Sequence, residues 1–119
     1  MSKKERIRAY YSDIDGRDYD QVMALFADNA RYRRADSCYD GKPALDDFFR
    51  HQRKIHGTHT LETLIEDGAL IVAIGRFEGV GDKGDARAVN FTDVWTFGSD
   101  DKVVLRRTYL AFGHEYVLK

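Results

Sequence analysis

The 119-residue chain is long enough for one domain with a real hydrophobic core and too short for two. Its content of 43% hydrophobic and 33% charged residues is typical of an ordinary soluble globular protein. A formal net charge of -1 gives the chain as a whole no electrostatic basis for binding nucleic acid or an anionic membrane.

Helical periodicity dominates the chain up to about residue 56. Ser2 and Glu5 have the spacing of a capping box, and apolar residues then recur at three- and four-residue steps. These features predict an amphipathic helix over residues 3–14 that ends at Gly16. A short helix capped near Asp18 is predicted next, with Val22, Met23 and Phe26 on one face. A short strand is predicted over 30–36. A third predicted helix begins near Gly41 and Pro43 and ends at Gly57.

Extended periodicity dominates the chain after Gly57. It predicts four strands, joined by short turns that make neighbouring strands antiparallel, over residues 58–66, 69–79, 86–98 and 102–113. Helices followed by an antiparallel sheet form an α+β fold, with the helices packed on one face of a curved sheet. We expect a single domain over residues 1–119.

The sequence also predicts the cellular location. One cysteine, Cys38, excludes an internal disulfide, which fits a reducing cytoplasm. The N-terminus is too charged for a secretory signal, and no apolar run approaches the roughly 20 residues that a membrane helix needs. We therefore expect a cytoplasmic, unprocessed chain.

Two motif matches do not predict a cofactor or metal. The segment GVGDKG (79–84) has the spacing of a dinucleotide-binding loop, but it joins two strands and opens no helix. His51 and His56 are five residues apart, so they point to different faces of a helix, and Gly57 separates them from His59. The sequence therefore predicts neither a cofactor nor a metal site.

The strand over 86–98 places an acid on a covered face. Its side chains alternate between two faces, so Asp93 lies on the same face as Phe91 and Trp95. An ionised carboxylate is unfavourable there unless it is paired or reached by water. Asp93 is therefore either a general acid or base in a site or an acid held by a structural partner, arginine or histidine.

Two more polar residues lie on either side of Gly57. His59 shares the apolar face of the following strand with Leu61, Thr63 and Ile65. Arg53 lies at the border of the third helix's apolar face, where its guanidinium can turn out to solvent or inward to an oxyanion or to Asp93. The three residues predict a site, with inert packing as the alternative.

Tyrosines are candidate hydroxyl donors to the same pocket, namely Tyr10, Tyr32 and Tyr109. The last predicted strand fits two orientations by alternation alone. Either Arg107 with Tyr109, or Arg106 with Thr108, points inward.

Four segments in this order resemble the nuclear transport factor 2-like superfamily: DYDQVMALFADNARY (18–32), GKPALDDFF (41–49), FTDVWTF (91–97) and KVVLRRTYLAF (102–112). Within it, the chain is most similar to the SnoaL-like group, with its polyketide cyclases, ketosteroid isomerases and limonene-type epoxide hydrolases. The resemblance covers nearly the whole chain. It implies a cone-shaped, strongly curved, mostly antiparallel sheet wrapped around three N-terminal helices, an apolar cavity, and a homodimer through the outer sheet face.

The resemblance also bears on the reaction. Asp93 matches an inward aspartate of the cyclases and epoxide hydrolases. Phe91 and Thr108 stand where the epoxide hydrolases carry an arginine and a second aspartate, so their triad is incomplete here. The three acid and tyrosine groups of the ketosteroid isomerases are not all matched. The cyclase-like pattern, one acid or base aspartate in a dry pocket, is the one that remains.

We therefore expect a cofactor-independent cyclase or isomerase that moves a proton on a polyketide-like or other apolar carbonyl substrate. Asp93 is the predicted acid or base, His59 shares or relays the proton, and Arg53 with a tyrosine stabilises the oxyanion. The predicted pocket is lined by Phe48, Phe91 and Trp95. The alternatives are a non-catalytic protein that binds a small ligand or an assembly partner, and an epoxide-hydrolase-like enzyme. A small apolar or polycyclic ligand is the expected partner.

Overall fold

The computed structural model of the chain describes residues 1–111. In that range the elements follow in the order α1 (Lys3–Asp15), α2 (Tyr19–Ala24), β1 (Phe26–Arg34), β2 (Ser37–Asp40), α3 (Lys42–Asp47), a π-helical turn η1 (Phe48–Gln52), β3 (His56–Asp67), β4 (Leu70–Val80), β5 (Ala86–Phe97) and β6 (Val103–Ala111). The end of the predicted last strand, residues 112–113, lies outside the described residues. None of the helices in residues 1–111 is both long and apolar enough to cross a membrane.

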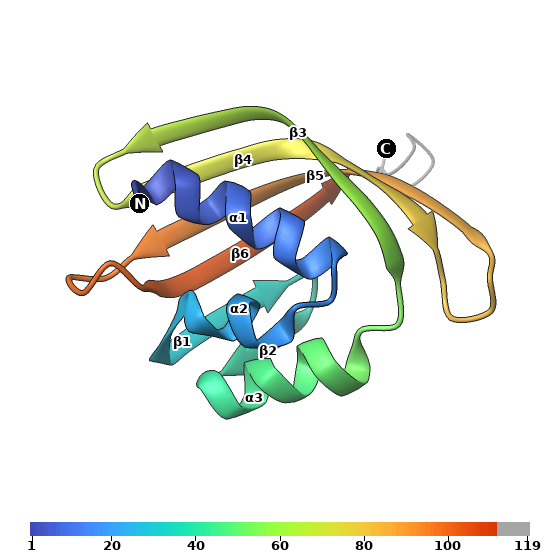
Figure 1. The fold of residues 1–119 in the computed structure, drawn as a ribbon, viewed down its shortest axis with the longest axis horizontal. Helices are drawn as coiled ribbons and strands as arrows, with labels where there is room; N and C mark the ends of the chain where they lie inside the picture. The colour runs from blue at the N-terminus through green and yellow to red at the C-terminus, as the bar shows by residue number, and fades with distance from the viewer. Residues whose placement is uncertain (112–119) are drawn as a thin grey trace.

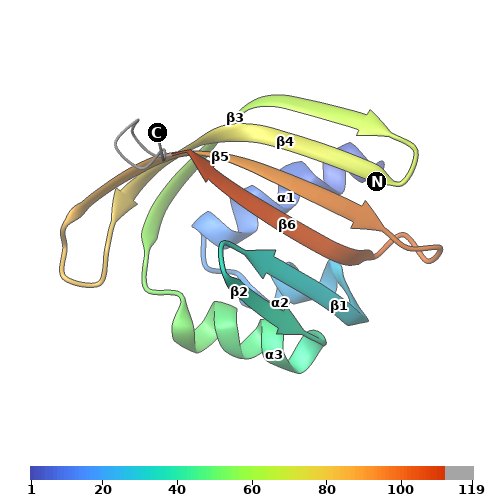
Figure 2. The ribbon, with the colours of Figure 1, turned by 180° about the vertical axis from the view of Figure 1, so that it is seen from behind.

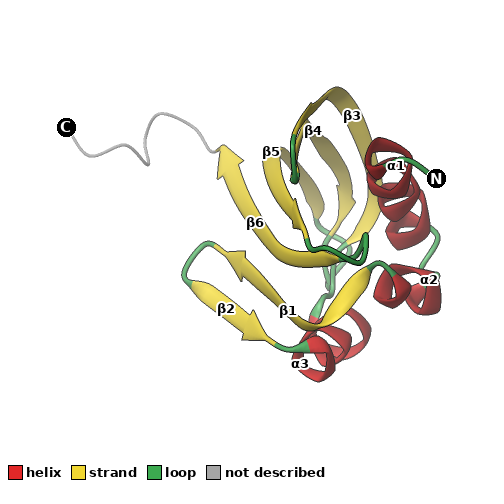
Figure 3. Cartoon of the chain, turned by 90° about the vertical axis from the view of Figure 1, so that its left-hand side faces the viewer, coloured by secondary structure: helices red, strands yellow, loops and turns green. Residues whose placement is uncertain are grey.

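The strands form one curved sheet with the order β2-β1-β6-β5-β4-β3. Neighbouring strands are antiparallel except β1 and β6, which are parallel. Figure 1 shows α1 lying across β3 to β6, with α2 and α3 beside β1 and β2. Figure 2 shows the other face of β3 to β6 from behind, and Figure 3 shows the curvature that wraps the sheet toward the helices. The predicted α+β fold with a curved, mostly antiparallel sheet is confirmed.

Helix α1 begins with the predicted capping box. The Ser2 hydroxyl accepts a hydrogen bond from the Glu5 main-chain N–H at 3.1 Å, and the Glu5 carboxylate accepts one from the Ser2 N–H at 3.3 Å. The helix ends at Asp15, with Gly16 as its C-cap. Its apolar face buries residues at three- and four-residue steps against the sheet, namely Ile7, Tyr10, Tyr11 and Ile14.

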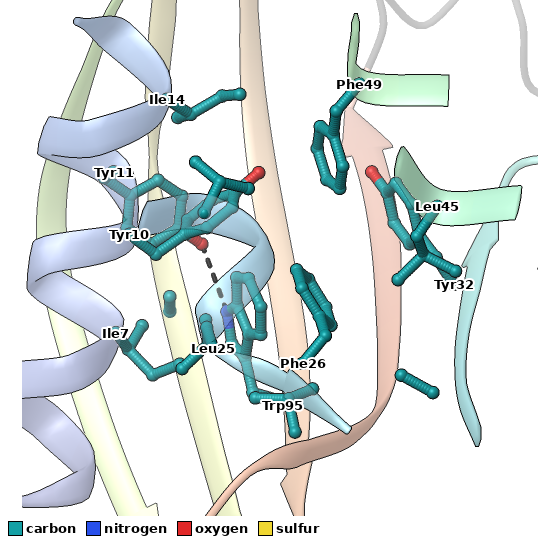
Figure 4. Packing of buried hydrophobic residues seen from close by; sticks show 14 of the residues in the cluster. Ile7, Tyr10, Tyr11, Ile14, Leu25, Phe26, Tyr32, Leu45, Phe49 and Trp95 are labelled. Carbon is teal, nitrogen blue, oxygen red and sulfur yellow. Dashed lines mark hydrogen bonds between the residues drawn. The ribbon is translucent and has the colours of Figure 1, made fainter. Parts of the chain in front are cut away.

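The hydrophobic core lies between α1, η1 and the concave face of the sheet (Figure 4). Trp95 of β5 is fully buried at its centre. Its ring centroid lies 4.7 Å from that of Tyr10 and 6.0 Å from that of Phe26. Such edge-on and tilted aromatic pairs add packing energy beyond the buried area, so this cluster fixes α1 against β5.

The prediction that the third helix runs to Gly57 is wrong. The helical segment ends at Gln52, and β3 begins at His56. Gly57 lies inside β3 and pairs with Gly79 of β4. A Cβ atom on Gly57 would lie 2.2 Å from the Glu78 carbonyl oxygen, so glycine is needed here for close approach of two strands, not to end a helix.

A β-bulge in β3 changes the predicted faces of that strand. The register shifts between Leu61 and Thr63, so Glu62 is an extra residue with no partner on β4. Beyond the bulge Leu64 packs against the core, while Ile65 is 49% exposed. The prediction that Thr63 and Ile65 share the covered face with Leu61 is therefore wrong, because one inserted residue reverses the alternation.

The region before α3 contains more strand than the sequence predicted. The predicted strand over 30–36 is β1, which begins earlier, and it pairs with a second strand, β2, that was not predicted. Phe26, expected on a helix face, is the first residue of β1 and is fully buried. The β1–β2 hairpin extends the sheet and closes one side of the site.

Candidate functional site

A cavity of about 80 Å³ lies between the concave face of the sheet, α1 and η1. Arg34, Arg106 and Thr108 are part of its wall. Seven of the residues that the sequence proposed for a site also line it: Tyr10, Tyr32, Phe48, Arg53, His59, Phe91 and Asp93.

Two proposed residues lie elsewhere. Trp95 is fully buried in the core, where its indole N–H donates to the Tyr11 hydroxyl at 3.2 Å (Figure 4). Tyr109 lies on the outer face of β6 and is 55% exposed, so its predicted place in the pocket is wrong. The reason is the register of β6. Thr108 stands opposite Asp93 and shares its inward face, which turns Tyr109 outward.

Asp93 is the centre of a buried hydrogen-bond network. Its carboxylate is 1% exposed and accepts hydrogen bonds from the Tyr11 hydroxyl, from Arg106 Nη2 at 2.9 Å and from the Thr108 hydroxyl at 2.5 Å. Thr108 is in turn hydrogen-bonded to the Tyr32 hydroxyl at 3.0 Å. With three donors on its two oxygens, Asp93 has little capacity left to take a proton from a substrate.

Arg106 is the guanidinium that binds Asp93, and the structure resolves the orientation that alternation left open. It is 4% exposed, its Nη1 donates to the Tyr10 hydroxyl at 2.5 Å, and its guanidinium carbon lies 4.5 to 4.7 Å from the ring centroids of Tyr10, Tyr32 and Trp95. Burial by itself lowers the pKa of Arg106, but Asp93 and the tyrosines raise it above its usual range. Its Nε has no partner among residues 1–111.

Arg53 lies directly after η1 and lines the cavity. Its Nη1 donates to the Ile55 carbonyl at 3.2 Å. Arg106, from β6, takes the place beside Asp93 that the sequence left open to Arg53. Burial lowers the pKa of Arg53, and the nearby Arg106 charge lowers it further, while Tyr10 acts in the opposite direction. Arg53 is thus a partly buried cation that faces the cavity.

His59 forms a pair with Asp15, the last residue of α1. The His59 main-chain N–H donates to Asp15 Oδ2 at 2.8 Å, and His59 Nδ1 lies 2.6 Å from Asp15 Oδ1. Because a carboxylate accepts hydrogen bonds, Nδ1 carries the proton and Nε2 keeps a free lone pair. The ring packs against Phe77 and Phe91, at centroid distances of 4.8 and 5.4 Å. His59 is therefore a lining residue of the cavity whose ring is held by Asp15.

The electrostatics of this pair lead to a pH prediction. Burial lowers the pKa of His59 below its ordinary value of 6.5, and the hydrogen bond to Asp15 offsets only part of that effect. We expect the His59 ring protons to titrate with a midpoint below 6.5 in an NMR pH titration. The folded state then binds fewer protons than the unfolded state just below 6.5, so this group lowers the free energy of unfolding as the pH falls through that window. A midpoint above 6.5 would contradict the assignment.

Sequence reasoning missed two members of the site. Tyr11 follows Ile7 by four residues, a spacing that fits the covered face of the helix, but no sequence signal joins it to Asp93. Asp15 lies 44 residues before His59, and their contact depends on how α1 docks on β3. Within residues 1–111, no three His, Cys, Asp or Glu side chains are grouped so that they could hold a metal ion.

The sequence profile of the SnoaL-like domain matches residues 7–106. No curated protein sequence matches the chain. Among solved structures, an NTF2-like protein of unknown function from Burkholderia pseudomallei K96243 is similar, with 23% identity, a TM-score of 0.84 and coverage of 93% of this chain and 92% of that chain.

Two other solved structures have named activities. A protein of Shewanella denitrificans assigned as a SnoaL-like polyketide cyclase has 16% identity and a TM-score of 0.79 over 92% of this chain and 90% of that chain. An LEH-like epoxide hydrolase of M. tuberculosis has 17% identity and a TM-score of 0.80 over 92% and 82%. At these identities the likeness establishes a common fold, and the reaction has to be argued from the cavity.

Proposed function

This chain belongs to the SnoaL-like domain family, and on that premise we propose that it is a cyclase or isomerase that moves a proton on a small carbonyl compound without a cofactor. The observation that carries the proposal is the His59–Asp15 pair in the wall of a cavity that also holds guanidinium and tyrosine donors. Proton transfer next to a carbonyl requires a base, a group that orients the base, and hydrogen-bond donors that stabilise the oxyanion.

In the proposed reaction, His59 Nε2 removes a proton from the carbon next to the carbonyl. The electrons of the C–H bond move to the carbonyl oxygen, which becomes an enolate, and Asp15 stabilises the imidazolium that forms. Arg53 lines the cavity and has donors that no described residue uses, and it would donate to the enolate oxygen. In a substrate with a carbon–carbon double bond next to the carbon that loses the proton, the enolate is a dienolate, and return of the proton to its far carbon gives an isomer. Attack of the enolate carbon on a second carbonyl closes a ring, and the imidazolium protonates the new alkoxide.

We assign the base to His59 and not to Asp93 because their surroundings differ. Asp93 already accepts three hydrogen bonds, one of them from Arg106, whereas Nε2 of His59 keeps its lone pair. Asp93 then serves as a fixed anion that orients Tyr11 and Arg106. This division of roles differs from the sequence-based hypothesis, in which Asp93 was the base.

The size of the cavity limits the substrate. Its volume of about 80 Å³ is well below the roughly 300–1,000 Å³ of pockets that enclose drug-sized ligands. A compact carbonyl compound suits this space, whereas the predicted polycyclic ligand would require the cavity to widen.

Deuterium exchange tests the proposal directly. The protein is incubated in D₂O with 2-butanone, cyclohexanone or pyruvate, and the loss of the protons next to each carbonyl is followed by ¹H NMR. We expect faster exchange for at least one compound than in the same buffer with an equal concentration of imidazole. Exchange no faster than with imidazole for every compound would contradict the proposal.

A second candidate is a non-catalytic protein that binds a small ligand. The observation that favours it is the network around Asp93, whose carboxylate already accepts hydrogen bonds from Tyr11, Arg106 and Thr108. Ligand binding without exchange would support this candidate. The epoxide-hydrolase alternative is less well supported, because Thr108 stands opposite Asp93 where the resemblance implies a second aspartate.

A further inference from the structure

The charges that line the cavity are unbalanced. Three arginines contribute to its wall, Arg34, Arg53 and Arg106, and the only carboxylate there among residues 1–111 is Asp93. Asp93 forms its ion pair with Arg106 at 2.9 Å. The other ion pairs in the described part of the chain involve neither Arg34 nor Arg53. Among residues 1–111, these two cations therefore have no anionic partner.

Arg53 is the more constrained of the two. Its one hydrogen bond in the described residues goes to the Ile55 carbonyl, which leaves most of its donors unused. Burial lowers its pKa, which means that its surroundings disfavour the charge. Arg34 is half-buried, with its guanidinium carbon 5.1 Å from the ring centroid of Phe48. An anion bound in the cavity would relieve the unfavourable burial of Arg53 and accept hydrogen bonds from the donors that the described residues leave unused.

The volume and the remaining walls narrow the class of anion. A space of about 80 Å³ admits a compact molecule, and the phenyl rings of Phe77 and Phe91 give it an apolar side. The cavity thus combines two arginines in its lining with an apolar wall.

We propose that the substrate is a small oxo acid whose carboxylate is held by Arg53 and Arg34. This inference rests on the proposed function, because it supplies the carbonyl compound on which His59 acts. A planar carboxylate matches the two parallel donors of a guanidinium. The positive charges of Arg34 and Arg53 attract the anion before it enters the cavity, and salt weakens this attraction.

A matched pair of probes tests the anionic group. Pyruvate and pyruvamide have nearly the same shape, but only pyruvate carries a charge, and 2-oxobutanoate with its amide forms a second pair. Binding is measured by isothermal titration calorimetry at low ionic strength. We expect each acid to bind about 10- to 100-fold more tightly than its amide, the range for a charge-assisted hydrogen bond to a partly buried group. Equal affinity within each pair, or no binding of either acid, would overturn the inference.

Variants then locate the site. Replacement Arg53→Gln is expected to remove most of the preference for the acid and to leave the affinity for the amide nearly unchanged. Arg33→Gln is the control, because Arg33 neighbours Arg34 on β1, is exposed and lies outside the cavity. An equal loss in both variants would show that overall charge, not the cavity, attracts the acid, and would overturn the inference.

Further outcomes distinguish between related interpretations. One distinguishes a carboxylate site from a general anion site, and the others distinguish the oxo-acid proposal from the proposed function. Inorganic phosphate that displaces pyruvate with equal affinity would show a general anion site and would also overturn the assignment. If the protein catalyses deuterium exchange of neutral ketones and shows no preference for the acids, the proposal of an oxo-acid substrate is contradicted. The proposed function is still supported in that case. Tight binding of the acids with no exchange contradicts the proposed function and supports the anion site.

Discussion

Replacement of His59 by glutamine is expected to slow the deuterium exchange of a small carbonyl compound by about 10²–10⁴-fold, the usual contribution of a positioned base. Glutamine keeps a side-chain amide that can donate to Asp15, but it has no basic lone pair at the position of Nε2. We expect proton transfer to slow and substrate binding to be retained, because the apolar walls and the arginines of the cavity are unchanged. The measurement is the exchange rate by ¹H NMR under saturating substrate.

His51 provides the matched control for this experiment. It lies on η1, is exposed and does not line the cavity, so His51→Gln should leave the exchange rate nearly unchanged. Replacement of Asp15 by asparagine keeps a hydrogen bond to His59 and removes the charge that stabilises the imidazolium. We expect it to lower the rate and to change the pH profile of the rate, which loss of packing alone would not do. Wild-type activity in His59→Gln would exclude this base.

Replacement of Arg106 by methionine is expected to lower the free energy of unfolding by about 3–5 kcal/mol. The large effect arises because Asp93, which is 1% exposed, would keep a buried negative charge without its cation. The loss of cation–π contacts with Tyr10, Tyr32 and Trp95 adds to it. The measurement is equilibrium unfolding in urea, extrapolated to water.

The neighbouring residue on β6 is the control for this effect. Arg107 points to the opposite face, is half-buried and forms no ion pair in residues 1–111, so Arg107→Met should change the free energy of unfolding by only about 1 kcal/mol or less. Addition of Asp93→Asn to the Arg106→Met variant removes the uncompensated charge and should restore part of the loss. Equal effects of Arg106→Met and Arg107→Met would mean that the buried pair contributes little to stability.

Strong local patterns allowed much of the fold to be predicted from the sequence. The capping box at Ser2 and the alternation around Asp93 specify an element and its buried face without distant contacts. Gly57 shows where this approach fails. A glycine after a helical stretch resembles a helix end, but here it is required by the strand on its other side, where Gly79 lies. The bulge at Glu62 could not be predicted either, because it is defined by the pairing of β3 with β4.

The candidate site was predicted in part for the same reason. Asp93, His59 and Arg53 were identified because each polar side chain stood on or beside an apolar face, and all three line the cavity. Their partners were not predicted, since they come from elements far away in the chain. Asp15 reaches His59 from α1, and Arg106 reaches Asp93 from β6 only after the register of that strand is set.

The Asp15 carboxylate at the end of α1 has a consequence for the dynamics of the protein. It holds both the main chain and the ring of His59 across 44 residues of sequence, so the orientation of the proposed base depends on the docking of one helix. Local opening of α1 from the sheet would free the imidazole and admit water, even while the strands stay paired. The proposed activity would then be lost in a sub-global opening, before the sheet unfolds.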